Sequence, residues 1–230
     1  MPTSHMAYMS DIMYYVDAIR PRRTLDIGIG CGKYGFLTRE IVEIHGLARA
    51  VFSTAGPVPT ADETSAVIDG VEVFEQYVTP LHRLVYNKIM IGNALDILPK
   101  IDAHSYDMAI AIDVLEHFTE PDGRLFLERC HRVADAVLIA TPNGVYEQGA
   151  ACGNEHEVHR STWTRRKLTK CGYTVVMVTR DTLLAMAGSS PEVAALCRRS
   201  KWRMLYRKLC PEIIRESGFR EFVRAFWPRG

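Results

Sequence analysis

The sequence predicts an α/β domain built on a doubly wound, mostly parallel sheet. Short apolar segments of β type alternate with segments of helical periodicity along most of the chain, which is typical of parallel strands joined by helices. Residues 107–112 and 136–140 are almost wholly apolar, as strands are when helices cover both faces of a sheet. A chain of 230 residues, 47% hydrophobic and 24% charged, can bury such a core without a disulfide or a structural metal.

The first half of the chain is predicted to contain two helices and two strands. Ser10 is the expected N-cap of the first helix, an apolar stripe at i, i+3, i+4 and i+7 runs along it, and Pro21 ends it. A β-type segment then leads into a glycine-rich turn and a second helix. Glycines and prolines interrupt the next stretch, which we expect to be an irregular insertion before the second strand. The two helices are expected at residues 10–20 and 33–44, and the two strands at residues 24–27 and 67–74. The insertion is expected at residues 46–64.

The second half alternates more regularly between strands and helices. The turn sequence TPNG at residues 141–144 should end the fifth strand, and Ser161 or Thr162 should cap the helix that follows. We expect the domain to span residues 1–190 and residues 191–230 to form a basic helical tail. The expected strands are residues 88–91, 107–112, 136–140 and 175–178, and the expected helices are residues 94–98, 123–133 and 161–170.

The most informative segment is TLDIGIGCGKYG, at residues 24–35. Glycine permits a sharp turn and lets a ligand approach the backbone, and the helix that follows offers free N–H groups at its N-terminus. The segment therefore predicts a nucleotide- or carboxylate-binding corner at the carboxyl end of the first strand. It is not a P-loop, because Ile27 stands where the first glycine belongs and Tyr34 stands where Ser or Thr would bind Mg²⁺.

A dinucleotide-binding turn satisfies part of the pattern. Gly30, Gly32 and Gly35 match GxGxxG, but the acidic residue expected about 20 residues later is absent between Glu43 and Asp62. An NAD(P)-dependent oxidoreductase is therefore kept as an alternative function. A tight turn that binds nothing is the remaining explanation of these glycines.

The wider arrangement resembles the class I S-adenosylmethionine-dependent methyltransferases. LDIGIGCG at residues 25–32 is similar to motif I of that family, and IDGVEVF at residues 68–74 is similar to the end of its second strand. IGNALDILP at residues 91–99 resembles the loop that lines the adenine, and YDMAIAIDVLEHF at residues 106–118 resembles the fourth strand and the turn after it. The resemblance covers about residues 10–180. It implies a Rossmann-like fold with a seven-stranded sheet and S-adenosylmethionine as the methyl donor, which leaves as S-adenosylhomocysteine (SAH).

The resemblance also implies a cofactor site. Glycine backbone would contact the methionine and ribose, a carboxylate would accept both ribose hydroxyls, a short apolar and polar edge would meet the adenine, and strand-end acids would orient the turn and the cofactor ammonium. The apolar residue of the edge would equally suit the core, and the strand-end acids would equally suit helix capping. The glycines are Gly28, Gly30 and Gly32, and the carboxylate is that of Glu72. Val73, Asn93 and Ala94 form the edge that meets the adenine, and Asp26 and Asp113 are the strand-end acids.

Two features depart from the family pattern. Asn93 stands where Asp is usual, and its amide oxygen can still accept a hydrogen bond from the adenine amino group, without charge assistance. The insertion at residues 46–64 is either a surface loop or a lid or wall of the substrate site.

The methyl acceptor is expected to be a hydroxyl of a sugar, a glycan or another small metabolite, because residues 159–175 resemble a segment of methyltransferases from glycan and natural-product biosynthesis. His117 is the leading general base, since it follows the fourth strand and imidazole titrates near neutral pH. Glu116 is the alternative base, and the Glu-His pair also suits a scaffolding role. His159 either lines the substrate pocket or caps the next helix. No metal site is expected, because His156 and His159 lack a third ligand at zinc-like spacing.

Charge divides the chain into an acidic body and a basic tail. Residues 1–197 contain 18 Lys or Arg and 24 Asp or Glu, whereas residues 198–230 contain 10 and 3. Apolar residues at helical spacing in the tail predict amphipathic helices that pack on the domain, on a second subunit of a homodimer, or on a membrane surface. Membrane contact would suit a third function, a non-catalytic cofactor-binding adaptor. Nucleic acid is disfavoured as a partner, because the body is acidic and the turn after the fourth strand lacks the Asn/Asp-Pro-Pro-aromatic sequence of enzymes that methylate base amines.

Composition limits the cellular context. No apolar stretch approaches the roughly 20 residues of a membrane span, and the polar N-terminus carries no signal-peptide core. The six cysteines are scattered without a CxxC pair, which indicates reduced thiols. We therefore expect a cytoplasmic protein, with peripheral membrane contact only through residues 198–230.

Overall fold

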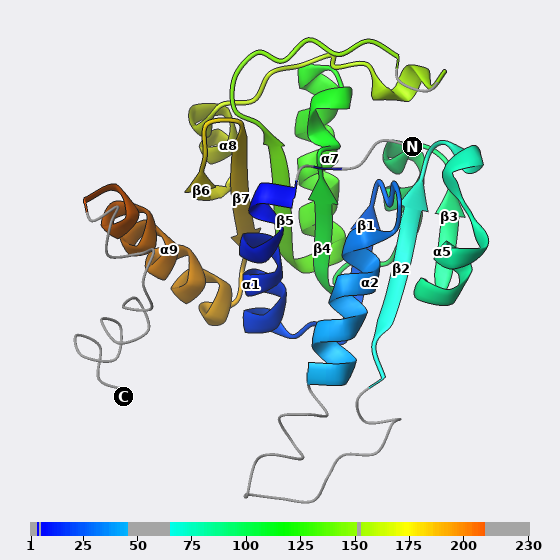
Figure 1. Cartoon of the computed structure of the whole chain (residues 1–230), viewed down its shortest axis with the longest axis horizontal. Helices are drawn as coiled ribbons and strands as arrows, with labels where there is room; N and C mark the ends of the chain where they lie inside the picture. Colours follow the sequence, from blue (N-terminus) through cyan, green and yellow to red (C-terminus); the bar gives the residue numbers. More distant parts are fainter. Residues whose placement is uncertain (1–3, 5, 46–64, 151–152, 210–230) are drawn as a thin grey trace, which may run out of the picture.

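A seven-stranded sheet forms the centre of the molecule (Figure 1). The computed structural model describes residues 4, 6–45, 65–150 and 153–209, so the predicted insertion at 46–64 and the tail beyond residue 209 lie outside the described residues. The strand order is β3-β2-β1-β4-β5-β7-β6. The strands are β1 (Arg23–Ile27), β2 (Val67–Glu72), β3 (Lys88–Ile91), β4 (Tyr106–Ile112), β5 (Ala134–Pro142), β6 (Thr174–Val178) and β7 (Thr182–Gly188).

Neighbouring strands pair in parallel except at β7, which runs antiparallel to both β5 and β6. The chain builds outward from β1 to β3 and then crosses back to place β4 on the other side of β1. The strand order therefore reverses between β1 and β4, and ligands of open α/β sheets bind at the carboxyl ends of the strands at such a point. The predicted doubly wound, mostly parallel, seven-stranded sheet is confirmed.

Helices cover both faces of the sheet. On one face lie α1 (Met9–Ile19), α2 (Lys33–Arg39), its continuation as a π-helix (Glu40–His45), and α9 (Pro191–Leu209). On the other face lie α6 (Ala94–Ile97), α7 (Glu120–Val133) and α8 (Arg165–Lys170), and α5 (Pro80–Val85) packs beside α2. The 3₁₀ segments are η1 (Met6–Tyr8), η3 (Glu75–Tyr77), η4 (Leu98–Lys100), η5 (Leu115–His117) and η6 (Glu155–Glu157).

The position of β4 explains its nearly continuous apolar sequence. Ala109 and Ala111 join the core cluster under α7, whereas Met108 and Ile110 join the cluster under α1 and α9. Both faces of this strand are buried, so polar residues would be desolvated on either side. A rigid central strand thus carries Asp113 to the carboxyl edge of the sheet.

Two predicted helix caps are wrong. Ser10 lies inside α1, which follows η1 directly and has no capping side chain. Neither Ser161 nor Thr162 caps α8, because the hydroxyl of Thr164 does so. The helix begins late because the backbone N–H of Ser161 donates to the Glu116 carbonyl at 3.1 Å, which holds the preceding segment extended.

The beginning of the predicted tail packs on the domain. Val193 and Leu196 of α9 join the same core cluster as α1, and the hydroxyl oxygens of Tyr15 and Ser200 lie 2.6 Å apart. Side chains beyond residue 200 lie outside the described part of the structure, so membrane contact by the tail stays a prediction. Within the described residues, no helix combines the length and the apolar character that crossing a bilayer requires.

Candidate active site

A cavity of about 930 Å³ opens at the carboxyl edge of the sheet. The glycine turn after β1, the ends of β2 and β4, the loop after β3 and the described residues between β5 and α8 line it. Figure 1 shows the last of these segments crossing above the strand ends. Most residues predicted for the cofactor and the chemistry line this cavity, namely Gly28, Gly30, Glu72, Val73, Asn93, Ala94, Asp113, Glu116, His117 and His159.

The glycine turn has a backbone that favours glycine. Gly28, Gly30 and Gly32 have φ angles of 73°, 51° and 79°. A Cβ on Gly28 would also overlap Val114 Cγ2, so the turn passes the end of β4 only without a side chain. Gly32 lies outside the cavity lining, and its contribution is therefore to the shape of the turn.

Asp26 lies behind the glycine turn and does not line the cavity. It is 2% exposed, and its Oδ2 accepts a hydrogen bond from the Tyr86 hydroxyl at 2.6 Å. Burial raises the pKa of Asp26 to about 7, although the Tyr86 hydrogen bond opposes the shift. The Tyr86 ring in turn packs so closely on Gly35 that a Cβ there would overlap it. Asp26 and Tyr86 thus fix the back of the turn.

Glu72, the last residue of β2, joins the glycine turn to the second strand. Its Oε2 accepts a hydrogen bond from the Gly30 N–H at 3.2 Å, and its Oε1 accepts one from the Phe74 N–H at 3.0 Å. Burial raises the pKa of the Glu72 carboxyl, and these backbone donors lower it in part. The two oxygens are held in place at the cavity wall with acceptor capacity left over, which is what the two hydroxyls of a ribose require.

Asn93 follows β3 beside this carboxylate. The N–H of Gly92 donates to the Glu72 carbonyl at 2.8 Å, which ties the end of β3 to the end of β2. Asn93 Oδ1 accepts a hydrogen bond from the Leu95 N–H at 2.9 Å and so caps α6. Asn93 and Ala94 therefore form a fixed edge of the cavity next to Glu72.

Asp113 faces the cavity from the end of β4. Its φ of 55° lies in the left-handed region, a strained conformation for a residue other than glycine and one that clusters at functional sites. The Tyr8 hydroxyl donates to Asp113 Oδ2 at 2.5 Å, and Lys33 Nζ donates to the Ser4 carbonyl at 2.7 Å. The amino-terminal segment therefore closes one side of the cavity over the glycine turn.

Glu116 joins η5 to the loop after β5. The Thr141 hydroxyl donates to Glu116 Oε2 at 3.1 Å, and the Glu116 carbonyl accepts hydrogen bonds from the N–H groups of Arg160 and Ser161 at 2.8 and 3.1 Å. The side chain is 2% exposed. Burial first, and the charge of Asp113 second, raise the pKa of Glu116 well above its usual range.

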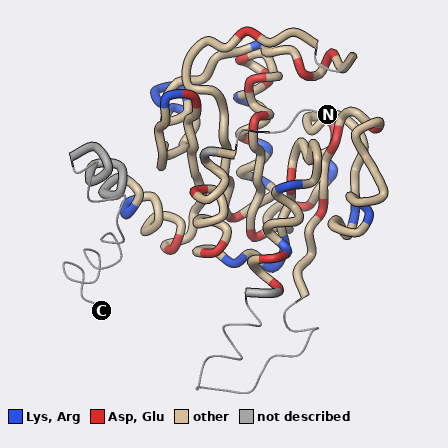
Figure 2. Tube along the Cα trace, viewed as in Figure 1, with Lys and Arg blue, Asp and Glu red and all other residues tan. Residues whose placement is uncertain are grey.

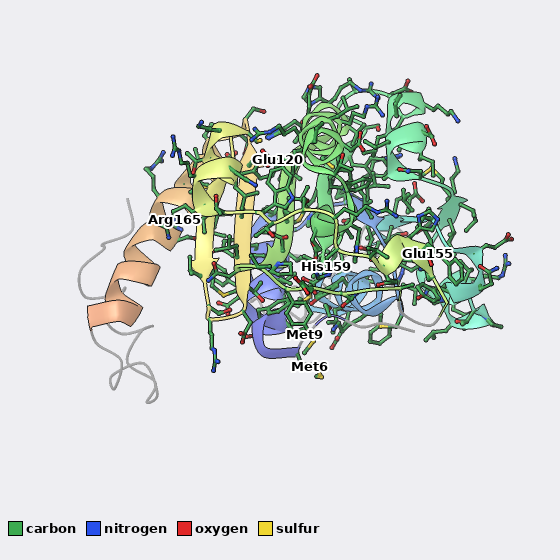
Figure 3. All side chains as sticks on the ribbon, turned by 90° about the horizontal axis from the view of Figure 1, so that it is seen from above. Met6, Met9, Glu120, Glu155, His159 and Arg165 are labelled. Carbon is green, nitrogen blue, oxygen red and sulfur yellow. The ribbon has the colours of Figure 1, made fainter. Side chains whose placement is uncertain are left out.

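The rings of His117 and His159 contact each other edge to face at one wall of the cavity, with centroids 5.1 Å apart. His117 Nδ1 lies 3.3 Å from the Val158 carbonyl, and His159 Nδ1 lies 2.7 Å from the Tyr146 carbonyl. Burial lowers the pKa of His117 to about 4, so its imidazole is neutral at pH 7. In the view from above in Figure 3, His159 lies near the middle of the molecule, over the strand ends.

One ligand atom from each of Glu116, His117 and His159 lies within 4.8 Å of the others. The expectation of no metal site rested on the residues next to His159 in sequence, whereas the fold brings Glu116 and His117 to it from another element. His156 lines the cavity but does not belong to this cluster. His159 does not cap α8, because Thr164 does.

Tyr8 and Glu157 also line the cavity, although neither was predicted as a site residue. Glu157 Oε2 lies 4.0 Å from His117 Nε2, and burial raises the pKa of Glu157. Each lies in a short 3₁₀ segment and belongs to no motif. Only the path of the chain over the strand ends brings them to the site.

Acidic groups dominate the cavity wall near the glycine turn and η5. The carboxyl groups of Glu72, Asp113, Glu116 and Glu157 line the cavity, and Figure 2 shows further acidic residues along the loop that crosses above it. Burial raises the pKa of Glu72, Glu116 and Glu157, which means that each carboxylate charge lacks full compensation. A positively charged ligand would provide that compensation, whereas an anionic pyrophosphate would add to the repulsion.

Comparison with known proteins gives a likeness of fold. No family model matches the sequence, and no curated protein matches it. The N-terminal domain of EvdMO1, solved in the presence of SAH and D-fucose, aligns at 12% identity over 83% of this chain and 86% of that one, with a TM-score of 0.53. The PH0226 protein from Pyrococcus horikoshii OT3 aligns at 14% identity over 80% and 88%, with a TM-score of 0.52. Monomeric WbdD aligns at 14% identity over 81% of this chain and 42% of that one, with a TM-score of 0.51.

Proposed function

We propose that this protein, whose fold is that of the class I methyltransferases, binds S-adenosylmethionine in the cavity and methylates a hydroxyl of a sugar, a glycan or another small metabolite. The observation that carries the proposal is the position of Glu72, whose carboxylate accepts the Gly30 N–H and so stands at the glycine turn. The same cavity contains Asn93 and Asp113, as the implied cofactor site requires. The neighbour solved with SAH and D-fucose supports a sugar among the acceptors.

The residues of the cavity fit this cofactor. Glu72 would accept the ribose hydroxyls, and Asp113 would attract the ammonium group. Asn93 and Ala94 would meet the adenine edge, with Val73 against its face. The backbone at Gly28 and Gly30 would contact the methionine, while Asp26 and Gly32 would hold the shape of the turn. When bound, the cofactor supplies an electrophilic methyl group on a positively charged sulfur.

The acceptor would enter between η5 and the loop after β5. Methyl transfer forms an oxygen–carbon bond while the carbon–sulfur bond breaks, and the hydroxyl proton must leave. The protein's task is therefore alignment and removal of that proton. Glu116, His117 and His159 line this part of the cavity. His117 is neutral and so able to accept a proton, but a pKa of about 4 makes it a weak base.

Two alternative functions fit less of the structure. An NAD(P)-dependent oxidoreductase would place a pyrophosphate at the turn, where Gly30 N–H already donates to Glu72 and Asp113 adds a second carboxyl group. A non-catalytic adaptor would keep the cofactor site, but it would have no use for the convergence of Glu116, His117 and His159.

Calorimetric titration of the full chain with S-adenosylmethionine, SAH, NAD⁺ and NADP⁺ tests the proposal. We expect saturable binding of the first two ligands alone, weakened by Glu72→Ala and unchanged by Glu128→Ala, a matched carboxylate removal on the exposed side of α7. Binding of a nicotinamide dinucleotide in place of SAH would overturn the proposal. SAH binding without methyl transfer to any of a panel of monosaccharides and glycans would favour the adaptor.

A further inference from the structure

Glu116, His117 and His159 form a compact cluster with the composition of a metal site. One ligand atom of each lies within 4.8 Å of the other two, and all three residues line the cavity. Glu116 is buried, and the other two are half-buried. We propose that these three side chains bind one divalent first-row metal ion and that the ion holds the acceptor hydroxyl.

The surroundings of the cluster orient its ligand atoms. His117 Nδ1 faces the Val158 carbonyl at 3.3 Å and His159 Nδ1 faces the Tyr146 carbonyl at 2.7 Å, so each ring presents Nε2 as its second nitrogen. The Thr141 hydroxyl donates to Glu116 Oε2 and leaves Oε1 as the other oxygen. Metal-binding histidines usually donate their second N–H to a carbonyl or carboxylate in this way, because the bond fixes the tautomer and the ring.

Two imidazoles and one carboxylate are a ligand set for Mn²⁺, Fe²⁺, Co²⁺ or Zn²⁺ with open positions. Ligand atoms about 2.0–2.2 Å from such an ion lie roughly 3–3.5 Å from one another. The three ligand atoms, which lie within 4.8 Å of one another, would move closer together to bind the ion. Glu157, whose Oε2 lies 4.0 Å from His117 Nε2, stands next to the cluster as a further oxygen ligand.

The charge of the site also favours a cation. Glu116 is buried beside Asp113 and Glu157, and uncompensated buried carboxylates are costly. A divalent ion would stabilise the ionised form of Glu116. It would also join Glu116 and His117 of η5 to His159 of the loop after β5 and so fix that loop over the cavity.

The role of the ion rests on the proposed methyl transfer, whereas its binding does not. An acceptor hydroxyl bound to the ion becomes more acidic, as metal-bound water does. Its proton passes to solvent, its oxygen forms the bond to the methyl carbon, and the carbon–sulfur bond electrons remain on the sulfur of SAH. His117 then acts as a ligand of the ion and not as the general base.

Titration with Co²⁺ tests the site directly. The full chain without a polyhistidine tag is treated with chelator, dialysed, and titrated with Co²⁺ while visible absorption and heat are recorded. We expect one equivalent to bind with d–d bands of a nitrogen- and oxygen-ligated ion. His159→Ala and His117→Ala should weaken binding by more than about 100-fold, beyond the roughly 10–100-fold effect of losing an outer partner. His156→Ala is the matched control and should bind Co²⁺ as the unaltered chain does, because it removes a histidine of the same loop from outside the cluster.

SAH affinity, measured on the same samples, separates this inference from the proposed function. Absence of Co²⁺ binding by protein that binds SAH would overturn the metal site and leave the methyltransferase. Equal loss of Co²⁺ binding in His156→Ala and His159→Ala would also overturn it, because the cluster would then not be the site. Co²⁺ binding that requires His117 and His159, in protein that binds no SAH, would support the metal site and contradict the proposed function.

Discussion

The two walls of the cavity are built in different ways. The wall that holds Gly28, Glu72 and Asn93 consists of residues at or directly after the ends of β1, β2 and β3. The wall that holds Glu116, His117 and His159 joins η5 to a loop about 40 residues later, through the hydrogen bonds of Arg160 and Ser161 to the Glu116 carbonyl. The first wall is placed by the sheet itself. The second exists only because a long connection returns to the same edge.

This difference leads us to expect that the first wall sets cofactor affinity and the second sets turnover. Substitutions in one wall should then leave the property of the other nearly unchanged. Substitutions at His117, Asp26, Glu72 and Asn93 test that division.

Removing His117 should have the largest effect. His117→Ala should lower turnover by roughly 10²–10⁴-fold, because the protein then lacks either its general base or a ligand of the ion that makes the acceptor hydroxyl more acidic. The affinity for SAH should stay within error, because the ring lies in the second wall. The measurement is kcat for transfer from labelled S-adenosylmethionine to the best acceptor in the panel, with calorimetry of SAH on the same protein.

His131→Ala is a control for that experiment, since this histidine packs on Tyr173 and does not line the cavity. A His117→Ala protein with near-normal kcat would remove His117 from the chemistry. A parallel loss of SAH affinity would show instead that the two walls are not separable.

Asp26, behind the first wall, should make the free energy of unfolding of the protein depend on pH. Its pKa is about 7 in the folded protein and near 3.8 when exposed, so the folded state binds its proton more tightly. The free energy of unfolding should therefore fall as pH rises from about 4 to about 7, by at most about 4 kcal/mol at 1.36 kcal/mol per pKa unit. Asp26→Asn cannot ionise and should lack this decline.

Urea unfolding of both proteins at pH 5, 6, 7 and 8 provides the measurement. The difference between the two curves isolates Asp26, since Glu72, Glu116 and His117 titrate in both proteins. Curves that stay parallel over this range would mean that Asp26 ionises as easily in the folded protein as in the unfolded chain.

The sequence predicted the strands of the sheet and the residues at their ends better than it predicted the long loop after β5. β4 was predictable because helices cover both of its faces, which leaves a continuous apolar segment. β7 was not predicted as a strand, because TLLAMAG at residues 182–188 consists largely of residues that favour helices in isolation. It becomes a strand through pairing with β5 on one side and β6 on the other.

The same contrast holds for the site. Gly28, Glu72 and Asn93 were found through the resemblance to methyltransferase motifs, which lie at or just after the ends of strands. Glu157 has no such pattern, and the convergence of His159 with Glu116 depends on how the loop after β5 folds back. No periodicity or spacing in the sequence predicts that the loop after β5 folds back to η5, so only the structure shows it.

Glu72 tests the cofactor role of the first wall. Glu72→Ala should weaken S-adenosylmethionine binding by roughly 1.5–3 kcal/mol, the scale for losing hydrogen bonds to a charged group. The turn should also loosen, because the Gly30 N–H loses its acceptor. Glu72→Gln keeps the shape of the side chain and one acceptor oxygen, so its affinity for S-adenosylmethionine should lie between those of Glu72→Ala and the unaltered chain. Calorimetric affinities give the order, and unchanged affinity in Glu72→Ala would place the ribose elsewhere.

Substitutions of Asn93 should have the smallest effect. Two different substitutions distinguish its role as a helix cap from its role in cofactor binding. Asn93→Ala loses the side-chain acceptor of the Leu95 N–H, so unfolding should become easier by about 1 kcal/mol. Asn93→Asp keeps the cap and adds a charge at the helix N-terminus, so stability should be retained. If the side chain also meets the adenine amino group, Asp should bind SAH more tightly than Asn, because its hydrogen bond becomes charge-assisted. Equal SAH affinities in Asn93→Asp and the unaltered chain, with the expected loss of stability in Asn93→Ala, would restrict Asn93 to the cap and place the adenine edge at Ala94 alone.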